Sequence, residues 1–262
     1  MRHEIIKQAF KLGNSAGVLL PNEWRNKKVL IKLIEKSITE EIFEILEENN
    51  LLKNTIGIFL AGSYARGEET EDSDIDVLVI TDNFNKQIKN GKYEIVFISK
   101  DRLDNSIMKS IYLASLISES KAILNGYFLE LYKNKVKGIF IKKQLDEIKS
   151  MTGINEKSIE IDKEMGEKVP DETIYSVVLR LREIYLIESL KNNKDFSNKE
   201  FLGLIRSIAS EESYNAYLRI KNNLKPKQTI AVEEAMALID ELKKRIRRLK
   251  NGKKKQKIEE SD

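Results

Sequence analysis

Two acidic residues interrupt an apolar run in the middle of the chain. In "DSDIDVLVI", Asp74 and Asp76 stand one residue apart where a strand would otherwise hold only Val, Leu and Ile. Side chains alternate along a strand, so both carboxylates are expected on one face and Ile75 and Val77 on the other. Adjacent carboxylates repel each other unless a cation lies between them. The pattern therefore predicts a divalent-metal site, and Mg²⁺ suits it because it binds few carboxylates and keeps water and phosphate oxygens as its other ligands.

The preceding segment, "AGSYARGE", contains groups that favour an anion. A strand that ends at Gly62 and Ser63 and opens a short helix presents free backbone N–H groups, which attract a phosphate. Gly62 allows close approach of the backbone, Ser63 adds a hydroxyl hydrogen bond, and Arg66 is expected to reach a triphosphate oxygen. An anion site beside a cation site is what a metal–nucleotide complex requires.

A third acid follows on the next strand-like run, "GKYEIVFIS". Glu94 is costly to bury there without a partner, so it either lies on an exposed edge or joins Asp74 and Asp76 as a triad. Two metal ions held by such a triad can activate an attacking hydroxyl and stabilise a leaving pyrophosphate.

The elements that must position these residues follow from the hydrophobic pattern. Helical spacing over residues 38–50 predicts a helix capped by Ser37 or Thr39. Strands are predicted in "TIGIFLAG", "DIDVLVIT" and "KYEIVFIS", and a short last one in "AILNG". A helix capped by Asp101 should precede that last strand. The result is a small mixed sheet with helices.

The two flanks differ from this centre. Residues 1–36 read as short strands with turns, in "IIKQAFKL", "VLLPNEW" and "KKVLIKLI". They are too few to form a core alone, so they should pair with a second copy or pack on the rest. Beyond about residue 127 the chain is helical, and apolar stripes at helical spacing predict a bundle. The stripes are Ile174, Val177, Val178, Leu181 and Tyr185, and Ala235, Leu238, Ile239, Leu242 and Ile246. The predicted fold is α+β, divided into residues 1–36, 37–126, 127–250 and a basic, polar tail at 251–262.

Composition excludes several classes of protein. Of 262 residues, 41% are hydrophobic and 34% charged, which is typical of a globular chain. The net charge of +4 is too small to indicate nucleic-acid binding by itself. The absence of cysteine excludes disulfides, thiolate metal sites and cysteine nucleophiles. No apolar leader or membrane-length run is visible, so we expect a cytoplasmic protein with no membrane partner.

The central motifs resemble the signature of the DNA polymerase beta nucleotidyltransferase superfamily, especially its minimal prokaryotic members. The resemblance rests on "GSYARGEETEDSDIDVLVI" and "YEIVFI" and covers about residues 37–125. It implies metal-dependent transfer of a nucleoside monophosphate from an NTP, by default ATP, to a hydroxyl on protein, RNA or a small molecule, with release of pyrophosphate.

The same resemblance implies the roles of individual residues. Gly62 and Ser63 would hold the triphosphate, and Asp74 and Asp76 would bind Mg²⁺ or Mn²⁺, with two ions expected. Glu94 would complete the triad as a third metal ligand and help to activate the acceptor. Many members of the family have Asp at that third position, so Glu94 is a small departure.

The first 36 residues are similar to swapped-hairpin domains of the AbrB type, on the strength of "GNSAGVLLPNEW". That similarity implies an interlocked homodimer that binds DNA. Its candidate phosphate contacts are Lys7, Lys11, Arg25, Lys27 and Lys28. The segment alternatively serves only to dimerise or to dock on the catalytic part. A DNA-binding regulator or antitoxin, with a secondary or inactive transferase domain, is the alternative function.

The helical part resembles the HEPN-like bundles that accompany such transferases. Ribonucleases of that group use an Arg followed closely by a His, whereas the sole histidine here is His3 and none follows Arg206. We therefore expect the bundle to bind the acceptor or form dimer contacts rather than cleave RNA.

Overall fold

The computed structural model describes residues 4–137 and 141–259, with side chains described up to residue 251, so His3 lies outside the described residues. The chain forms two compact units, Met1–Glu41 and Ile42–Asp262.

The N-terminal unit is a small hairpin with little regular structure. Strands β1 (Phe10–Leu12) and β2 (Ser15–Gly17) pair in antiparallel fashion, and η1 (Asn22–Trp24) follows. The strands expected in "VLLPNEW" and "KKVLIKLI" are absent from this described segment, because a short strand forms only where a neighbour supplies its hydrogen bonds. Within residues 4–41 no side chain is buried.

A five-stranded mixed sheet forms the centre of the second unit, in the order β5-β6-β4-β3-β7. Its strands are β3 (Thr55–Leu60), β4 (Ile75–Thr81), β5 (Lys86–Asn90), β6 (Tyr93–Ser99) and β7 (Lys121–Leu124). β4 and β6 are parallel and the other pairs antiparallel. The predicted mixed sheet is confirmed, with one strand, β5, that the sequence did not predict.

Helices before and after the sheet strands complete this part: α1 (Ile38–Glu48), η2 (Leu52–Asn54), α2 (Gly62–Arg66), α3 (Lys100–Ser106), α4 (Ile111–Glu119) and α5 (Gly126–Val136). Ser37 caps α1, since its Oγ accepts the Glu40 N–H at 3.2 Å. The single helix predicted to start at Asp101 is two helices, and each has a serine cap, Ser99 for α3 and Ser110 for α4. Apolar residues of α3, α4 and α5 pack with Phe59 and other strand residues into one core.

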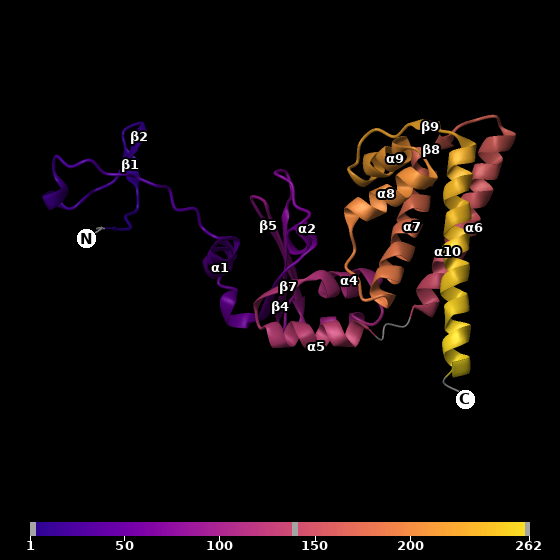
Figure 1. Ribbon diagram of the computed structural model, residues 1–262, viewed down its shortest axis with the longest axis horizontal. Helices are drawn as coiled ribbons and strands as arrows, with labels where there is room; N and C mark the ends of the chain where they lie inside the picture. Colours follow the sequence, from indigo (N-terminus) through magenta and orange to yellow (C-terminus); the bar gives the residue numbers. More distant parts are fainter. Residues whose placement is uncertain (1–3, 138–140, 260–262) are drawn as a thin grey trace. The chain divides into compact units, whose positions relative to one another are not determined.

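The C-terminal part is helical, as predicted. It consists of α6 (Lys142–Glu164), β8 (Val169–Pro170), α7 (Asp171–Lys191), α8 (Asn198–Ile208), α9 (Glu211–Lys221), β9 (Gln228–Ile230) and α10 (Val232–Glu259). The long helices α6 and α10 lie side by side (Figure 1). The two predicted stripes are in the core, except that Tyr185 is half-buried. α10 continues to Glu259, past residue 250 where the bundle was expected to end. None of the described helices is long and apolar enough to cross a membrane.

One buried ion pair joins the elements of this bundle. The Asp171 side chain, at the start of α7, is fully buried. It accepts bonds from Arg219 Nε and Nη2 at 2.6 and 2.8 Å and from the Lys227 backbone N–H at 2.9 Å. Burial alone would raise the pKa of Asp171, but these donors outweigh it and hold the pKa below the ordinary 3.8. The carboxylate is therefore charged in the folded protein and links α7, α9 and the strand before α10.

Asp171→Asn should lower the free energy of unfolding by about 3 kcal/mol near neutral pH, because it leaves the Arg219 guanidinium without its buried partner. Because folding lowers the pKa of Asp171, the effect also depends on pH. The stabilisation by this carboxylate is complete above its pKa in the unfolded chain and is lost as the pH falls through its pKa in the folded protein. Urea unfolding of both proteins from pH 7 down to pH 3 measures the difference, which should shrink towards the acid end.

The exposed pair Arg206–Glu211, with N and O at 2.7 Å, provides the matched control. Glu211→Gln should change the free energy of unfolding by less than about 1 kcal/mol. Equal losses in the two variants would contradict a special role for Asp171.

Candidate functional site

The predicted carboxylates gather on one face of the sheet. β4 and β6 are parallel, and their register places Asp76 directly opposite Glu94. Ile75, just before Asp76, and Ile95, just after Glu94, are fully buried on the other face of the sheet. Asp74 directly precedes β4, and its side chain is 50% exposed while that of Glu94 is 33% exposed. The alternation inferred from the sequence therefore brings these acids to one partly open surface.

The surroundings of Asp76 disfavour its charged form. Burial raises the pKa of Asp76, and the neighbouring charges of Glu94 and Asp74 raise it further. Arg66 and Lys221 act in the opposite direction. Lys221 is the last residue of α9, so a cation from the helical bundle lowers the pKa of Asp76. No sequence pattern connects Lys221 with Asp76, since the two residues lie far apart in the chain.

Gly62 lies directly against Asp76. Its φ is +64°, and a Cβ built there would stand 2.0 Å from Asp76 Oδ2. That distance is too short for any side chain, so only glycine fits at this position. The Ala61 N–H also donates to the Asp76 carbonyl oxygen at 2.8 Å. Ser63 is half-buried in the first turn of α2. The predicted anion-binding turn and the predicted metal ligands thus touch.

A lysine from the unpredicted strand β5 stands between two of the acids. Lys89 Nζ lies 2.7 Å from Glu94 Oε1 and 3.6 Å from Asp74 Oδ1. The hydrogen bond to Glu94 and the charge of Asp74 raise the pKa of Lys89. Its side chain is 61% exposed and is free to move towards solvent. The ammonium occupies the kind of position that a cation between carboxylates would take.

The donor set fits a hard divalent cation. Across the described residues, no three acidic or histidine side chains converge closely enough to hold an ion as they stand. Even so, the carboxyl oxygens that share this face are the ligands that Mg²⁺ and Mn²⁺ prefer.

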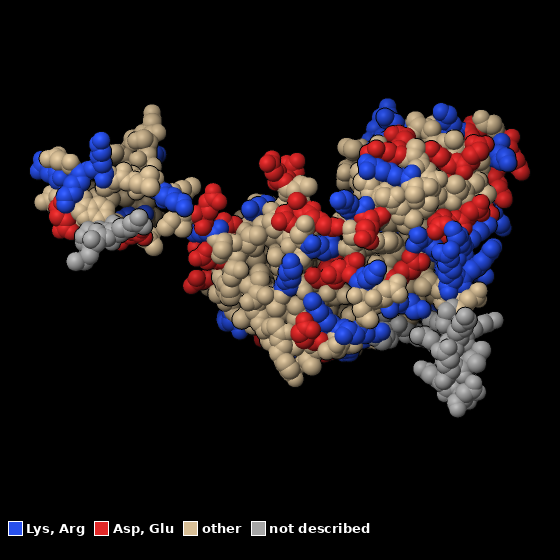
Figure 2. Space-filling view, viewed as in Figure 1, with Lys and Arg blue, Asp and Glu red and all other residues tan. Residues whose placement is uncertain are grey.

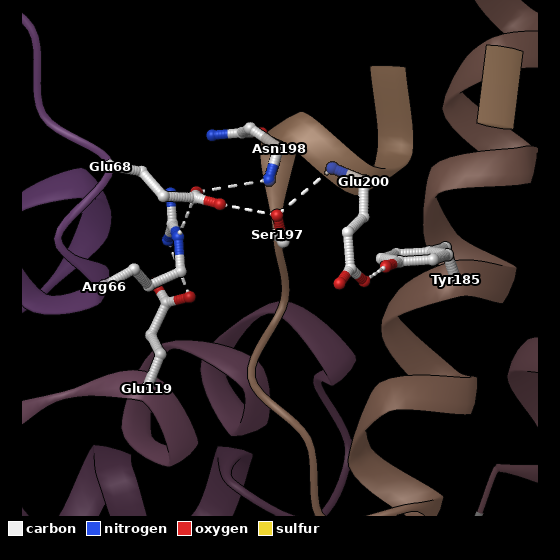
Figure 3. A network of polar contacts seen from close by, with 7 residues as sticks. All are labelled: Arg66, Glu68, Glu119, Tyr185, Ser197, Asn198 and Glu200. Atoms are coloured by element: carbon white, nitrogen blue, oxygen red, sulfur yellow. Dashed lines mark hydrogen bonds and ion pairs between the residues drawn. The ribbon is translucent and has the colours of Figure 1, made fainter. Parts of the chain in front are cut away.

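Arg66 lies in a buried ionic network rather than at the open face (Figure 3). Its Nε and Nη1 contact Glu68 at 3.0 Å and Glu119 at 2.7 Å. Burial raises the pKa of Glu119, whereas Arg66 and the Gly62 backbone N–H lower it. The guanidinium expected to face a triphosphate is therefore held by two internal carboxylates, and contact with phosphate would require it to exchange partners.

The same network reaches the helical bundle (Figure 3). Glu68 accepts bonds from the Ser197 hydroxyl and, at 3.3 Å, from the Asn198 N–H. Ser197 caps α8 by accepting the Glu200 N–H at 3.1 Å, and Glu200 accepts the Tyr185 hydroxyl at 2.6 Å. The contacts join α2 to α7 and α8. No sequence pattern pairs Glu68 with Ser197, which is 129 positions away.

The candidate DNA-binding residues all belong to the N-terminal unit and all are exposed. Lys11 lies in β1, and Lys7, Arg25, Lys27 and Lys28 lie in the segments around the hairpin and η1.

The contact between Gly62 and Asp76 yields a direct test. Gly62→Ala should destabilise the protein by about 1 to 3 kcal/mol more than Gly67→Ala, because only the first forces Asp76 to move. Gly67 is the matched control: its φ is +71° and nothing lies within 4 Å of a Cβ built there, so only backbone strain remains. Chemical denaturation of the two variants measures the difference, and equal stability would contradict the close packing.

Comparison with known proteins identifies the family. The model of the nucleotidyltransferase domain family matches residues 39–247. Among solved structures, the chain is similar to a nucleotidyltransferase-like protein from Exiguobacterium sibiricum, at 13% identity over 80% of this chain and 75% of that one, with a TM-score of 0.38. It is also similar to spectinomycin adenyltransferase from Enterococcus faecialis, at 15% identity over 79% of this chain and 97% of that one, with a TM-score of 0.38. No curated protein matches. Because the family model covers most of its length, the chain belongs to the nucleotidyltransferase domain family and is a nucleotidyltransferase.

Proposed function

We propose that this protein transfers a nucleoside monophosphate from an NTP, by default ATP, to the hydroxyl of an acceptor and releases pyrophosphate. The proposed metal ligands are Asp74, Asp76 and Glu94, and the proposed triphosphate site is Gly62 and Ser63. We expect the reaction to take place in the cytoplasm, where ATP and Mg²⁺ are both present.

The single observation that carries this proposal is the packing of Gly62 on Asp76. A Cβ at Gly62 would fall 2.0 Å from the Asp76 carboxylate, so a phosphate at the turn lies within reach of a cation held by the acids. The register that pairs Asp76 with Glu94 supplies the third carboxylate at the same place. Anion site and cation site form one surface.

The proposed division of roles follows from charge. Bound divalent ions, two of them in our proposal, would neutralise the triphosphate and lower the pKa of the acceptor hydroxyl. The Ser63 hydroxyl holds a phosphate oxygen, and the Gly62 N–H, which bonds to Glu119, would exchange that partner for a second one. We propose that Lys221, whose charge lowers the pKa of Asp76, binds the triphosphate as well.

The transfer itself needs one proton acceptor and one leaving group. The acceptor oxygen forms a bond to the α-phosphorus while the bond between that phosphorus and the pyrophosphate oxygen breaks. Glu94 is half-buried at the edge of the site and is placed to help remove the hydroxyl proton. Pyrophosphate leaves with the electrons of the broken bond. Lys89 must release Glu94 for this step, and its exposed side chain permits that.

Asp74→Asn and Asp76→Asn should each lower transfer by at least about a hundredfold, because each removes a charge that holds the cation, while the fold is retained. Transfer of label from each of the four α-³²P NTPs, with Mg²⁺ or Mn²⁺, into cell RNA, cell protein and the small-molecule fraction measures this and names the acceptor class. Asp72→Asn, an exposed acid two positions before Asp74, is the control and should retain activity. Full activity of either site variant would refute the metal assignment.

A second candidate function is specific to the N-terminal unit. Large apolar side chains are exposed there, among them Ile6, Leu30, Ile31, Leu33 and Ile34, and its visible surface is largely uncharged with scattered Lys and Arg (Figure 2). Apolar surface of this extent without a core supports pairing with a second copy. A dimer would bring two sets of cations together, and we infer a DNA-binding regulator or antitoxin role, in line with the AbrB-like pattern.

This candidate predicts a salt-dependent interaction with DNA. Replacing Lys27 and Lys28 by Gln should reduce the slope of log affinity against log salt concentration by about 2 per chain, since each phosphate contact contributes about 0.9. Fluorescence anisotropy with duplex DNA at several salt concentrations measures it, and the lysine pair Lys142 and Lys143 on α6 is the matched control.

Leu30→Glu should convert a dimer into a monomer in sedimentation velocity. An unchanged slope and an unchanged mass would overturn this candidate.

A further inference from the structure

A cavity of about 880 Å³ opens beside the carboxylate face, and its volume lies within the range of small-molecule sites. Its walls come from β5 and β6, from α3, α4 and α7, and from the segment between α7 and α8. Val96, Leu116 and Leu186 give it an apolar interior. All of these residues lie within the second unit.

The cavity adjoins the candidate active site along two elements. Val96 and Ile98 line it and share their face of β6 with Glu94, because alternate residues of this strand are buried on the other side. Two residues along a strand span about 7 Å, so a ligand against Val96 lies next to the Glu94 carboxylate. Arg66 lines the cavity from α2, the helix that begins at Gly62. A hydroxyl on a ligand in the cavity can thus face the acids.

The charged groups that line this cavity are unbalanced. Four are cationic, Arg66, Lys86, Arg102 and Arg182, and one is acidic, Glu119. Arg66 is held by Glu119 at 2.7 Å and by Glu68, behind the cavity wall, at 3.0 Å, so it adds no free positive charge. Three cations remain, and none of them has an ion pair with an acid within the described part of the chain. The nearby Glu183 carboxylate does not compensate them, because Arg180 binds it at 2.7 Å.

Arg182 is held in place for a ligand. Its guanidinium carbon lies 4.8 Å from the centre of the Phe196 ring, and its Nη1 donates to the Tyr217 hydroxyl at 3.2 Å. Neither partner carries a negative charge. A fixed guanidinium without a carboxylate partner is suited to a phosphate, which it can bind through two parallel hydrogen bonds.

We propose that this cavity binds the acceptor and that the acceptor is a small molecule carrying a phosphate group beside its reactive hydroxyl. The inference rests on the proposed transferase function and names the substrate class for it. Arg182 and Arg102 bind the phosphate, with Lys86 at the rim. A polycationic acceptor is disfavoured, because it would meet three uncompensated positive charges.

Ligand-observed NMR titration of the full-length protein with phenyl phosphate, and with phenol as its uncharged counterpart, tests this proposal. Mg²⁺ and saturating α,β-methylene-ATP keep the nucleotide site occupied. Phenyl phosphate should bind at least tenfold more tightly than phenol. Arg102→Gln and Arg182→Gln should each weaken phenyl phosphate binding at least tenfold and leave phenol binding unchanged. Arg102 is exposed and makes no side-chain hydrogen bond in the described structure, so its variant should fold even if that at Arg182 does not.

Arg247→Gln, an exposed arginine on α10 outside the cavity, is the matched control and should bind as the wild type does. Asp74→Asn should also bind phenyl phosphate normally, so that failure of transfer and failure of this site are distinguishable. Equal binding of phenol, the absence of saturable phenyl phosphate binding, or no effect of Arg102→Gln would overturn the proposal. Displacement of phenyl phosphate by α,β-methylene-ATP would assign the cavity to the nucleotide instead.

Discussion

Mutual repulsion among acids on one face of a small sheet is the constraint on which the rest of this structure depends. Asp76 is opposite Glu94 in the register of β4 and β6, and Asp74 lies two residues before Asp76, just ahead of β4. Burial together with both neighbours raises the pKa of Asp76. Such an arrangement persists only if positive charge compensates it. Lys89 and Lys221 supply that charge from a strand and a helix that the hydrophobic pattern did not connect to the site. In the proposed reaction, a metal–nucleotide complex would be the compensating group.

The helical bundle is tied to this site by buried polar contacts. Arg66 joins Glu68 and Glu119, and Glu68 continues to Ser197 at the start of α8, so α2 is fixed against both α4 and the bundle. Gly62 is the first residue of the short helix that ends at Arg66, so the network also fixes the turn at Gly62. The same interactions therefore position the proposed triphosphate site and hold Arg66 and Glu119 in the cavity wall.

Local pattern was sufficient for much of the fold. Alternation in "DIDVLVIT" and "KYEIVFIS" predicted the strands and the shared face of their acids, and the stripes in α7 and α10 predicted the bundle core. The missed features depend on neighbours distant in the chain. β5 is a polar edge strand whose hydrogen bonds come from β6. The ion pair between Arg66 and Glu119 depends on the packing of α4 against α2. In the N-terminal unit, apolar runs that predicted strands remain unpaired, because no residue within 4–41 is buried.

We propose that Asp76 and its neighbours hold a divalent cation in place of Lys89. Titration of the full-length protein with Mn²⁺ in the presence of α,β-methylene-ATP, followed by electron paramagnetic resonance, tests it without any need to know the acceptor. We expect saturable Mn²⁺ binding. Asp76→Asn should weaken it at least about tenfold, and Lys89→Met should strengthen it, because the competing ammonium is removed. Binding that is indifferent to both substitutions would contradict it.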